Sequence, residues 1–319
     1  MTAQQTKPAV EPKTQAFLDS LVGAPPLYTL SYEAAHAVLT DLQAKPVDKP
    51  EADVTDVEWP VGPTGSTRIR IVRPTHTAGA VLPVILFTHG GGWILGDKIT
   101  HDRLVRELAV GVHAVVVFVD YVNAPQAKHP TQIEQSYGAL KYIVEHAADL
   151  GVDANRLAIV GDSVGGAMAA AVTLLARQRR GPKIRYQVLF YPVTDFASDN
   201  ASYRAFADGP WLTERAMRWM FEAQGLDGTQ DFIAYPNRAT REQLEGLPDA
   251  LIITDDDILR DEGESYGKKL AAAGVRVTAV RFLGTIHDFV MLNPISDTPA
   301  PRSAIALAID HLRRALGVR

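Results

Sequence analysis

Short apolar runs alternate with helical patterns along most of this chain. Several of the apolar runs consist of Val, Ile and Leu without polar alternation, as expected for strands that are covered on both faces. Eight runs have strand character: Val57–Val61, Thr67–Arg73, Val84–His89, Val115–Tyr121, Leu157–Asp162, Tyr186–Val193, Ala250–Thr254 and Val277–Phe282. Helical patterns lie between them at Asp102–Val110, Gln132–Ala148, Val164–Arg179, Glu262–Ala273 and Pro301–Leu316. After a first hairpin, this order predicts an α/β fold with an eight-stranded, mostly parallel sheet flanked by helices.

Two segments do not follow this alternation. Residues 1–50 contain helical patterns at Thr14–Leu21 and Ser31–Gln43 that prolines separate, and residues 195–245 form a long interval around the helical Glu214–Gln224. Insertions of this length are usually functional. We therefore expect 1–50 and 195–245 to form a helical cap over one end of the main domain, residues 51–319. The alternative is a peripheral decoration without a role in chemistry.

Composition narrows the class of protein. With 319 residues, of which 46% are hydrophobic, the chain can bury a large core, and its net charge of −5 does not suggest binding to nucleic acid or to an anionic membrane. There is no cysteine, which excludes disulfides, thiolate metal ligands and a cysteine nucleophile. The polar stretch from Met1 to Ser20 does not resemble a secretory signal, and no apolar run approaches the length of a membrane span. We expect a soluble, cytoplasmic protein.

A run of three glycines follows one of the predicted strands, in His89-Gly90-Gly91-Gly92-Trp93. Each glycine costs roughly 0.5–1 kcal/mol of backbone entropy relative to alanine in a regular element, so bare backbone must be needed here. One explanation is an oxyanion hole, in which peptide N–H groups face a developing negative charge. The other is a tight loop after a strand. His89 is expected to hold the loop.

A second glycine-rich turn carries the candidate nucleophile. Gly161-Asp162-Ser163-Val164-Gly165-Gly166 joins an apolar strand to an alanine-rich helix, which is the context that a Gly-x-Ser-x-Gly nucleophile elbow requires. A nucleotide-binding turn is the alternative, but the motif comes after about the fifth strand and lacks the Rossmann spacing. It also lacks the lysine of a Walker A loop. We expect Ser163 to be a nucleophile.

A serine nucleophile needs a base and an acid, which in this type of hydrolase follow it in the order acid, then histidine. Of the two later histidines, His311 lies in the last helical pattern, whereas His287 follows the strand-like Val277–Phe282. His287 is therefore the expected base. The acid could be Asp255, Asp256 or Asp257, which are adjacent, with Asp261 and Glu262 just beyond; the cluster could also be a charged loop that caps a helix. Asp288, next to His287 in sequence, is expected to point elsewhere.

Together these motifs resemble the hormone-sensitive-lipase-type branch of the α/β-hydrolases, the bacterial carboxylesterases. The similarity rests on four motifs in order: His89-Gly90-Gly91-Gly92-Trp93, Gly161-Asp162-Ser163-Val164-Gly165-Gly166, Asp257-Ile258-Leu259-Arg260-Asp261-Glu262 and Gly284-Thr285-Ile286-His287-Asp288-Phe289. It covers nearly all of the chain from about residue 55. Two departures are Val164, where the family usually has alanine, and Ile258, where it usually has proline.

The resemblance implies a mechanism. It places the acid on Asp257 and the oxyanion-hole N–H groups on Gly91, Gly92 and Val164, with Gly90 shaping the turn. Ester hydrolysis then proceeds through an acyl-enzyme on Ser163, and neither a metal nor an organic cofactor is required. The resemblance also makes 51–319 the catalytic domain.

The substrate is less strongly indicated. Bulky rings near the serine, from Trp93, Tyr191, Trp211 and Phe289, would shorten the acyl pocket and favour acetyl to butyryl esters, unless they only pack the cap onto the core. We thus expect a short-chain carboxylesterase. A lactonase, an amidase or peptidase, and an interfacial lipase use the same triad, and a ligand-binding receptor is a further alternative. The oligomeric state stays open: the resemblance implies a homodimer as one arrangement, formed through an exposed edge strand, and Tyr186–Val193 and Val277–Phe282 are apolar enough to be candidates.

Overall fold

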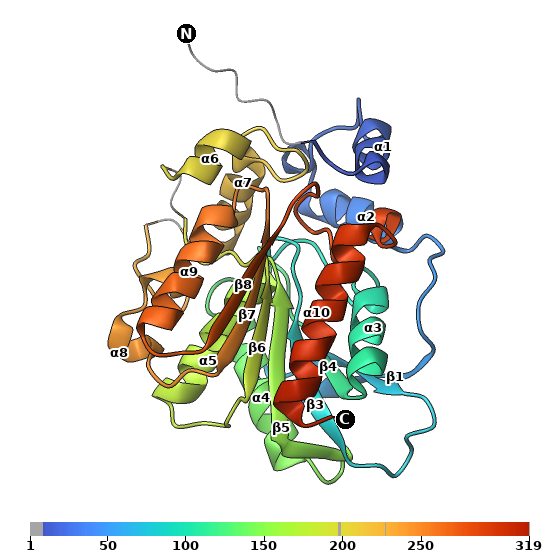
Figure 1. Cartoon of the computed structure of the whole chain (residues 1–319), viewed down its shortest axis with the longest axis vertical. Coiled ribbons are helices and arrows are strands. Elements are labelled where there is room, and N and C mark those ends of the chain that lie inside the picture. The colour runs from blue at the N-terminus through green and yellow to red at the C-terminus, as the bar shows by residue number, and fades with distance from the viewer. Residues whose placement is uncertain (1–8, 197–198, 227, 319) are drawn as a thin grey trace.

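A single eight-stranded sheet forms the centre of the molecule (Figure 1). The structure is a computed structural model and describes residues 9–196, 199–226 and 228–318. The strand order is β1-β2-β4-β3-β5-β6-β7-β8; β2 is antiparallel to both of its neighbours, and all other pairs are parallel. The strands are β1 (Ala52–Trp59), β2 (Thr67–Pro74), β3 (Leu82–Thr88), β4 (Val115–Asp120), β5 (Val152–Asp162), β6 (Tyr186–Phe190), β7 (Asp249–Asp255) and β8 (Val277–Phe282). The predicted strands and the mostly parallel sheet are confirmed.

The bounds of several strands differ from the prediction: β1 begins at Ala52 rather than Val57, and β5 begins at Val152 rather than Leu157. A further strand, β6, differs in length and in its place in the sheet. β6 ends at Phe190, because Tyr191 has a φ of 35° and Pro192 follows it. β6 also lies between β5 and β7, so both of its edges are paired. The expectation that Tyr186–Val193 could be an exposed edge strand is therefore wrong. β8 does lie at an edge of the sheet.

Helices cover both faces of the sheet (Figure 1). α3 (Asp102–Val112) and α10 (Pro299–Leu316) pack on each other and on one face, while α4 (Thr131–Glu145), α5 (Val164–Gln178) and α9 (Arg260–Ala272) cover the other. α5 is buried along nearly its whole length between the sheet and α4, which explains its alanine-rich sequence. The buried side chains of sheet and helices form one continuous hydrophobic core. No helix within the described ranges combines the length and apolar character needed to cross a bilayer.

The two irregular segments lie at the same end of the sheet. Figure 1 shows α1 (Pro12–Ser20) and α2 (Tyr32–Gln43) beside α6 (Ala201–Phe206) and α7 (Glu214–Gln224). The N-cap side chains of Ser31 and Thr213 set the starts of α2 and α7. The segments contact each other through ring pairs, Phe17 with Trp211 and Tyr32 with Trp219, whose centroids are 5.4 and 5.2 Å apart.

The remaining elements are short. They are α8 (Arg241–Leu244), which begins with a capping box, and the 3₁₀ turns η1 (Leu27–Thr29), η2 (Pro236–Arg238) and η3 (Asn293–Ile295). Neither α6, of six residues, nor α8, of four, was predicted, because such short helices show no hydrophobic period.

Glycines allow α5 to approach β3 with backbone against backbone. A Cβ atom on Gly165 would lie 2.1 Å from the carbonyl oxygen of Thr88, and one on Gly161 would lie 2.2 Å from the carbonyl oxygen of Gly165. The Thr88 hydroxyl donates a hydrogen bond to that same Gly165 oxygen, at 2.7 Å. These glycines therefore hold the strand end and the helix start together.

We predict that Gly165→Ala destabilises the protein by about 1–3 kcal/mol, the usual cost of overpacking a rigid site, because the obstructing atoms belong to backbone. Urea unfolding would measure the loss. The matched control is Gly267→Ala in α9, where the nearest atom to the new Cβ is the flexible Ile252 Cδ1 at 3.2 Å. Alanine is the better helix former by about 0.8–1 kcal/mol, so this variant is expected to unfold no earlier than wild type. Equal midpoints for the two variants would contradict the packing argument.

Candidate active site

Ser163 sits in the sharp turn between β5 and α5. Its backbone has φ 54° and ψ −123°, a combination that a non-glycine residue adopts at a cost of about 1–3 kcal/mol. The turn is tied to the neighbouring strand, since the Ser163 N–H donates to the Phe190 carbonyl at 2.9 Å. Ser163 is 5% exposed. The strand-to-helix context expected of a nucleophile elbow is thus present.

Three side chains from three parts of the sheet meet at this turn. The Ser163 Oγ lies 2.9 Å from Nε2 of His287, and Nδ1 of His287 lies 2.6 Å from Oδ2 of Asp257. Asp257 follows β7 and His287 follows β8, so parallel strand ends bring them together. The other oxygen of Asp257 accepts the N–H of Leu259 at 2.9 Å, which fixes the carboxylate. This is the geometry of a nucleophile, its base and an orienting acid.

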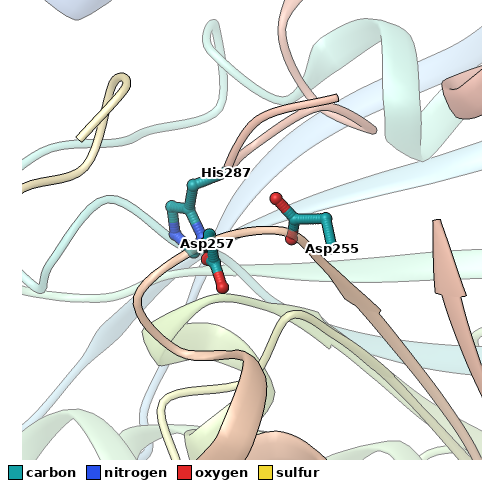
Figure 2. Close-up of side chains that lie close together, drawn as sticks. All are labelled: Asp255, Asp257 and His287. Carbon is teal, nitrogen blue, oxygen red and sulfur yellow. Dashed lines mark hydrogen bonds and ion pairs between the residues drawn. The ribbon is translucent and has the colours of Figure 1, made fainter. Parts of the chain in front are cut away.

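The three adjacent aspartates have different surroundings. Figure 2 shows the Asp257 carboxylate against the His287 ring, with Asp255 beside them. Asp255 is fully buried, and neither of its carboxylate oxygens has a hydrogen-bond partner among the described residues. Burial, with the nearby Asp257 charge, raises the pKa of Asp255 well above its usual range. Asp256 is partly exposed. Only Asp257 contacts the histidine as an orienting acid does.

Asp255, Asp257 and His287 each have one atom within 4.8 Å of the others, a spacing that could in principle suit a metal ion. However, Asp257 Oδ2 and His287 Nδ1 bind each other, and His287 Nε2 faces the serine. Two of the three residues, Asp257 and His287, therefore already use these atoms within the hydrogen-bonded chain, and only Asp255 has unpaired oxygens among the described residues.

Negative charge around the histidine affects its protonation. Burial alone would lower the pKa of His287, but the carboxylates of Asp288, Asp257 and Asp255 outweigh burial and raise the pKa to about 9. The histidine and the carboxylates that stabilise its cation are thus coupled in one buried cluster.

The glycine run lies beside the serine. Gly91 and Gly92 have φ values of 98° and 62°, in the left-handed region that glycine adopts freely. A Cβ on Gly92 would lie 2.2 Å from Sδ of Met220 in α7. Within the described part of the chain, no hydrogen bond is formed by the N–H groups of Gly91, Gly92 or Val164. These donors are therefore free to bind an oxyanion.

Side chains that the sequence reasoning did not single out hold this loop. The Gly90 N–H donates to Oδ1 of Asp162 at 3.0 Å, and Oδ2 of Asp162 pairs with His101 Nε2 at 3.1 Å. Asp162 could have been noticed in the sequence, because it directly precedes Ser163. No sequence pattern connects Asp162 to His101.

His89 supports the loop from inside the core. Its ring stacks on Tyr121 with centroids 3.9 Å apart, and Nδ1 donates to the Gly90 carbonyl at 2.8 Å. Burial lowers the pKa of His89 to about 3, so the ring is neutral.

A largely apolar cavity of about 680 Å³ opens onto the serine. Ser163, His287, Gly91 and Gly92 line it together with side chains from both irregular segments, among them Leu18, Leu39, Leu212, Met217 and Met220.

Of the four aromatic residues expected at the pocket, only Trp211 lines this cavity. The other three lie behind its wall. Trp93 packs on Phe221, and Tyr191 packs between His287 and Phe289. Sequence proximity to the catalytic motifs did not tell which rings face the cavity.

Asp288 does not point away from the site as expected. Its Oδ1 lies 3.4 Å from His287 Nε2, and its Oδ2 accepts a hydrogen bond from Trp211 Nε1 at 2.9 Å. The reason is its backbone, which has a φ of 67° and so directs the side chain differently from an extended residue. Burial raises the pKa of Asp288, while His287 and the Trp211 N–H act against this rise.

The sheet, the elbow and the Ser–His–Asp geometry define the class of protein as an α/β-hydrolase. A family model described as the alpha/beta hydrolase fold matches residues 85–291, and the chain belongs to this family. Within it, the chain is a hormone-sensitive-lipase-type serine esterase that acts on carboxylic esters.

Relatives along the full chain support this assignment. A thermostable esterase from Pseudomonas putida ECU1011 is 46% identical, with a TM-score of 0.94 over 98% of this chain and 99% of that one. Carboxylesterase NlhH of Mycobacterium tuberculosis (strain ATCC 25618 / H37Rv) is 36% identical over 97% of both chains. An ethyl acetate hydrolase of Pseudomonas putida is 31% identical over 85% of this chain and 86% of its own.

Proposed function

We propose that this esterase hydrolyses short-chain acyl esters through an acyl-enzyme on Ser163, with His287 as general base and Asp257 as the orienting acid. The observation that carries the proposal is the unbroken path from Ser163 Oγ through His287 to Asp257, at 2.9 and 2.6 Å, at the wall of an apolar cavity. Both distances lie within the range in which a proton can be transferred or a ring oriented.

The first half-reaction forms the acyl-enzyme. Ser163 Oγ attacks the ester carbonyl carbon as His287 Nε2 takes its proton, and the Asp257 carboxylate stabilises the resulting imidazolium. The tetrahedral intermediate then collapses, the bond from carbon to the alcohol oxygen breaks, and His287 gives its proton to the leaving alcohol. Water repeats the sequence on the acyl-enzyme and releases the acid.

We assign to the N–H groups of Gly91, Gly92 and Val164 the stabilisation of the negatively charged oxygen in the tetrahedral intermediate. Their lack of partners and the position of Val164 at the start of α5 support this assignment, because a helix N-terminus adds a favourable dipole. Preorganised donors of this kind each account for about 10²–10³ in rate.

A short acyl group fits the surroundings of the serine best. Met220 packs directly on Gly92, and Trp211 is fixed by its hydrogen bond to Asp288, so bulky side chains limit the space next to the reacting carbonyl. The similarity to an ethyl acetate hydrolase favours the same size of acyl group. The leucines of the larger cavity would then contact the rest of the ester.

The helical segments are assigned as a cap. Residues 1–50, as far as the structure describes them, and residues 195–245 supply most of the apolar cavity wall, and their ring pairs hold them together. This supports a substrate-binding role for both segments, with residues 51–319 as the catalytic domain.

We predict that Ser163→Ala and His287→Ala lower kcat on p-nitrophenyl acetate by about 10⁴–10⁶, the loss that follows removal of a triad member. Wild-type kcat/KM is expected to fall as the acyl chain lengthens from butyrate to palmitate. The matched control is His311→Ala, because His311 contacts the Tyr186 hydroxyl far from the cavity; it should keep wild-type activity. Full activity of Ser163→Ala would refute the mechanism, and a preference for palmitate would refute the chain-length assignment.

We predict that kcat/KM rises with pH up to about 9. Only the neutral imidazole can accept the serine proton, and the pKa of His287 is raised to about 9, so protonation removes the active form as the pH falls below that value. A pH profile with p-nitrophenyl acetate, corrected for spontaneous hydrolysis, would measure this acid limb. Constant kcat/KM between pH 6 and 9 would contradict it.

We further propose a cytoplasmic homodimer that pairs two copies along β8. The position of β8 at the edge of the sheet supports this contact. Light scattering of the purified chain is expected to give twice the mass of 34.7 kDa. Ala279→Pro should give monomers, because the N–H of Ala279 faces the free edge of β8: the Ala250 N–H donates to the Arg276 carbonyl, so alternate residues of β8 point toward β7 and away from it. A wild-type monomer at micromolar concentration would rule the dimer out, and recovery of the protein outside the cytoplasm on cell fractionation would rule out the location.

A further inference from the structure

Asp288 is a carboxylate at the reaction centre that the mechanism above does not use. Its Oδ1 lies 3.4 Å from Nε2 of His287, the same nitrogen that faces the Ser163 hydroxyl at 2.9 Å. Asp288 lines the cavity together with both residues, and its side chain is 15% exposed. The carboxylate therefore borders the space where the bond to the acyl group forms and breaks.

The chain holds this side chain firmly in place. The second oxygen of Asp288 accepts the Trp211 N–H at 2.9 Å, and the Asp288 carbonyl accepts the N–H groups of Met291 and Leu292 at 2.9 and 3.0 Å. The φ of 67° is one that glycine would adopt with less strain.

We propose that Asp288 binds the water that hydrolyses the acyl-enzyme, as a second hydrogen-bond acceptor beside His287. This inference rests on the function proposed above. Two acceptors 3.4 Å apart can both be reached by one water oxygen with hydrogen bonds of about 2.8 Å. One hydrogen of the water then points to His287 Nε2, and the other points to Asp288 Oδ1.

The step balances without a further reactant. The water oxygen attacks the acyl carbon while His287 Nε2 takes one proton, and the second hydrogen remains on the oxygen with its hydrogen bond to Asp288. The tetrahedral intermediate collapses, the bond between the carbon and the Ser163 oxygen breaks, and His287 returns its proton to that oxygen. The products are the carboxylic acid and the free serine.

This arrangement distinguishes water from an alcohol. An attacking alcohol has one hydroxyl hydrogen, which must go to His287, so its oxygen has nothing left to donate to Asp288. Water donates to both acceptors at once. Asp288 therefore favours hydrolysis of the acyl-enzyme over transfer of the acyl group to alcohols.

The competing explanation is a structural one, in which Asp288 only ties Trp211 and its segment to the histidine loop. Product partitioning separates the two roles. When p-nitrophenyl acetate is hydrolysed with methanol present, acetate and methyl acetate both arise from one acetyl-enzyme, so their ratio does not depend on the rate of acylation.

We expect Asp288→Asn to raise the ratio of methyl acetate to acetate about tenfold, the value of one hydrogen bond to a charged group. Asp288→Gly removes the carboxylate in a residue suited to the left-handed backbone and should give the same increase, which covers the case in which the asparagine variant folds poorly. Trp211→Phe removes the tie and keeps the carboxylate. Asp41→Asn removes another carboxylate that lines the cavity. Asp41→Asn should leave the product ratio at the wild-type value, and Trp211→Phe, which loosens the Asp288 side chain but keeps its carboxylate, should raise the ratio by less than Asp288→Asn does, whatever their effect on the overall rate.

The outcomes separate this inference from the function on which it rests. If wild type forms both products and the Asp288 variants leave their ratio unchanged, the water-binding role is wrong and the esterase mechanism stands. If Trp211→Phe raises the ratio as much as Asp288→Asn does, the structural explanation replaces ours. If wild type forms no methyl acetate at any methanol concentration and Ser163→Ala is fully active, the acyl-enzyme mechanism and this inference both fail.

Discussion

The active site depends on the close approach of two backbone turns, one after β3 and one after β5. The contact leaves no room for a side chain at Gly90 or Gly165: a Cβ on Gly90 would lie 2.4 Å from Oδ2 of Asp162, and one on Gly165 would lie 2.1 Å from the Thr88 oxygen. The first turn carries the N–H groups of Gly91 and Gly92, and the second carries Ser163. Because the two turns are fixed against each other, the N–H groups and the serine that we propose as oxyanion donors and nucleophile have a fixed separation before any substrate arrives, as preorganised electrostatic stabilisation requires. Asp162 joins the two turns by accepting the Gly90 N–H.

The second constraint is the negative charge that is buried around His287. His287 is almost completely enclosed and lies near the carboxyl groups of Asp255, Asp257 and Asp288. Burial opposes the cation that catalysis creates, and the carboxylates offset that cost. Their roles differ by position, since Asp257 binds Nδ1 and Asp288 faces Nε2. Asp255 hydrogen-bonds to neither nitrogen, and burial together with the Asp257 charge raises its pKa. A single histidine can thus be stabilised on one side and left available for proton transfer on the other.

Much of the fold and of the site could be predicted from the sequence, because local signals specify them. Continuous Val/Ile/Leu runs predicted the strands, and Gly-x-Ser-x-Gly needed only its flanking strand and helix to identify the turn at Ser163. Other features depend on contacts between distant segments. No local pattern reveals that β6 is an inner strand, since strand order is set by how the helices cross over the sheet. The rings at Trp93, Tyr191 and Phe289 point into the core for the same reason. Asp288 could not be placed either, because a left-handed backbone at a non-glycine residue is invisible in the sequence.

Local contacts position the groups proposed to react, whereas contacts between distant segments form the cavity wall that selects the substrate. The reacting groups come from strand ends and tight turns of the sheet, whose geometry is held by backbone hydrogen bonds and glycine contacts. The cavity wall comes largely from residues 18–45 and 211–220, two segments that side-chain packing joins to each other, as in the pairs Phe17–Trp211 and Tyr32–Trp219. Substitutions in that wall can change which ester fits without disturbing the distances within the triad. Met220 and Trp211 are exceptions, because they contact Gly92 and Asp288 directly. Through Met220 and Trp211, the segment that forms part of the cavity wall also contacts the groups proposed to act in the reaction.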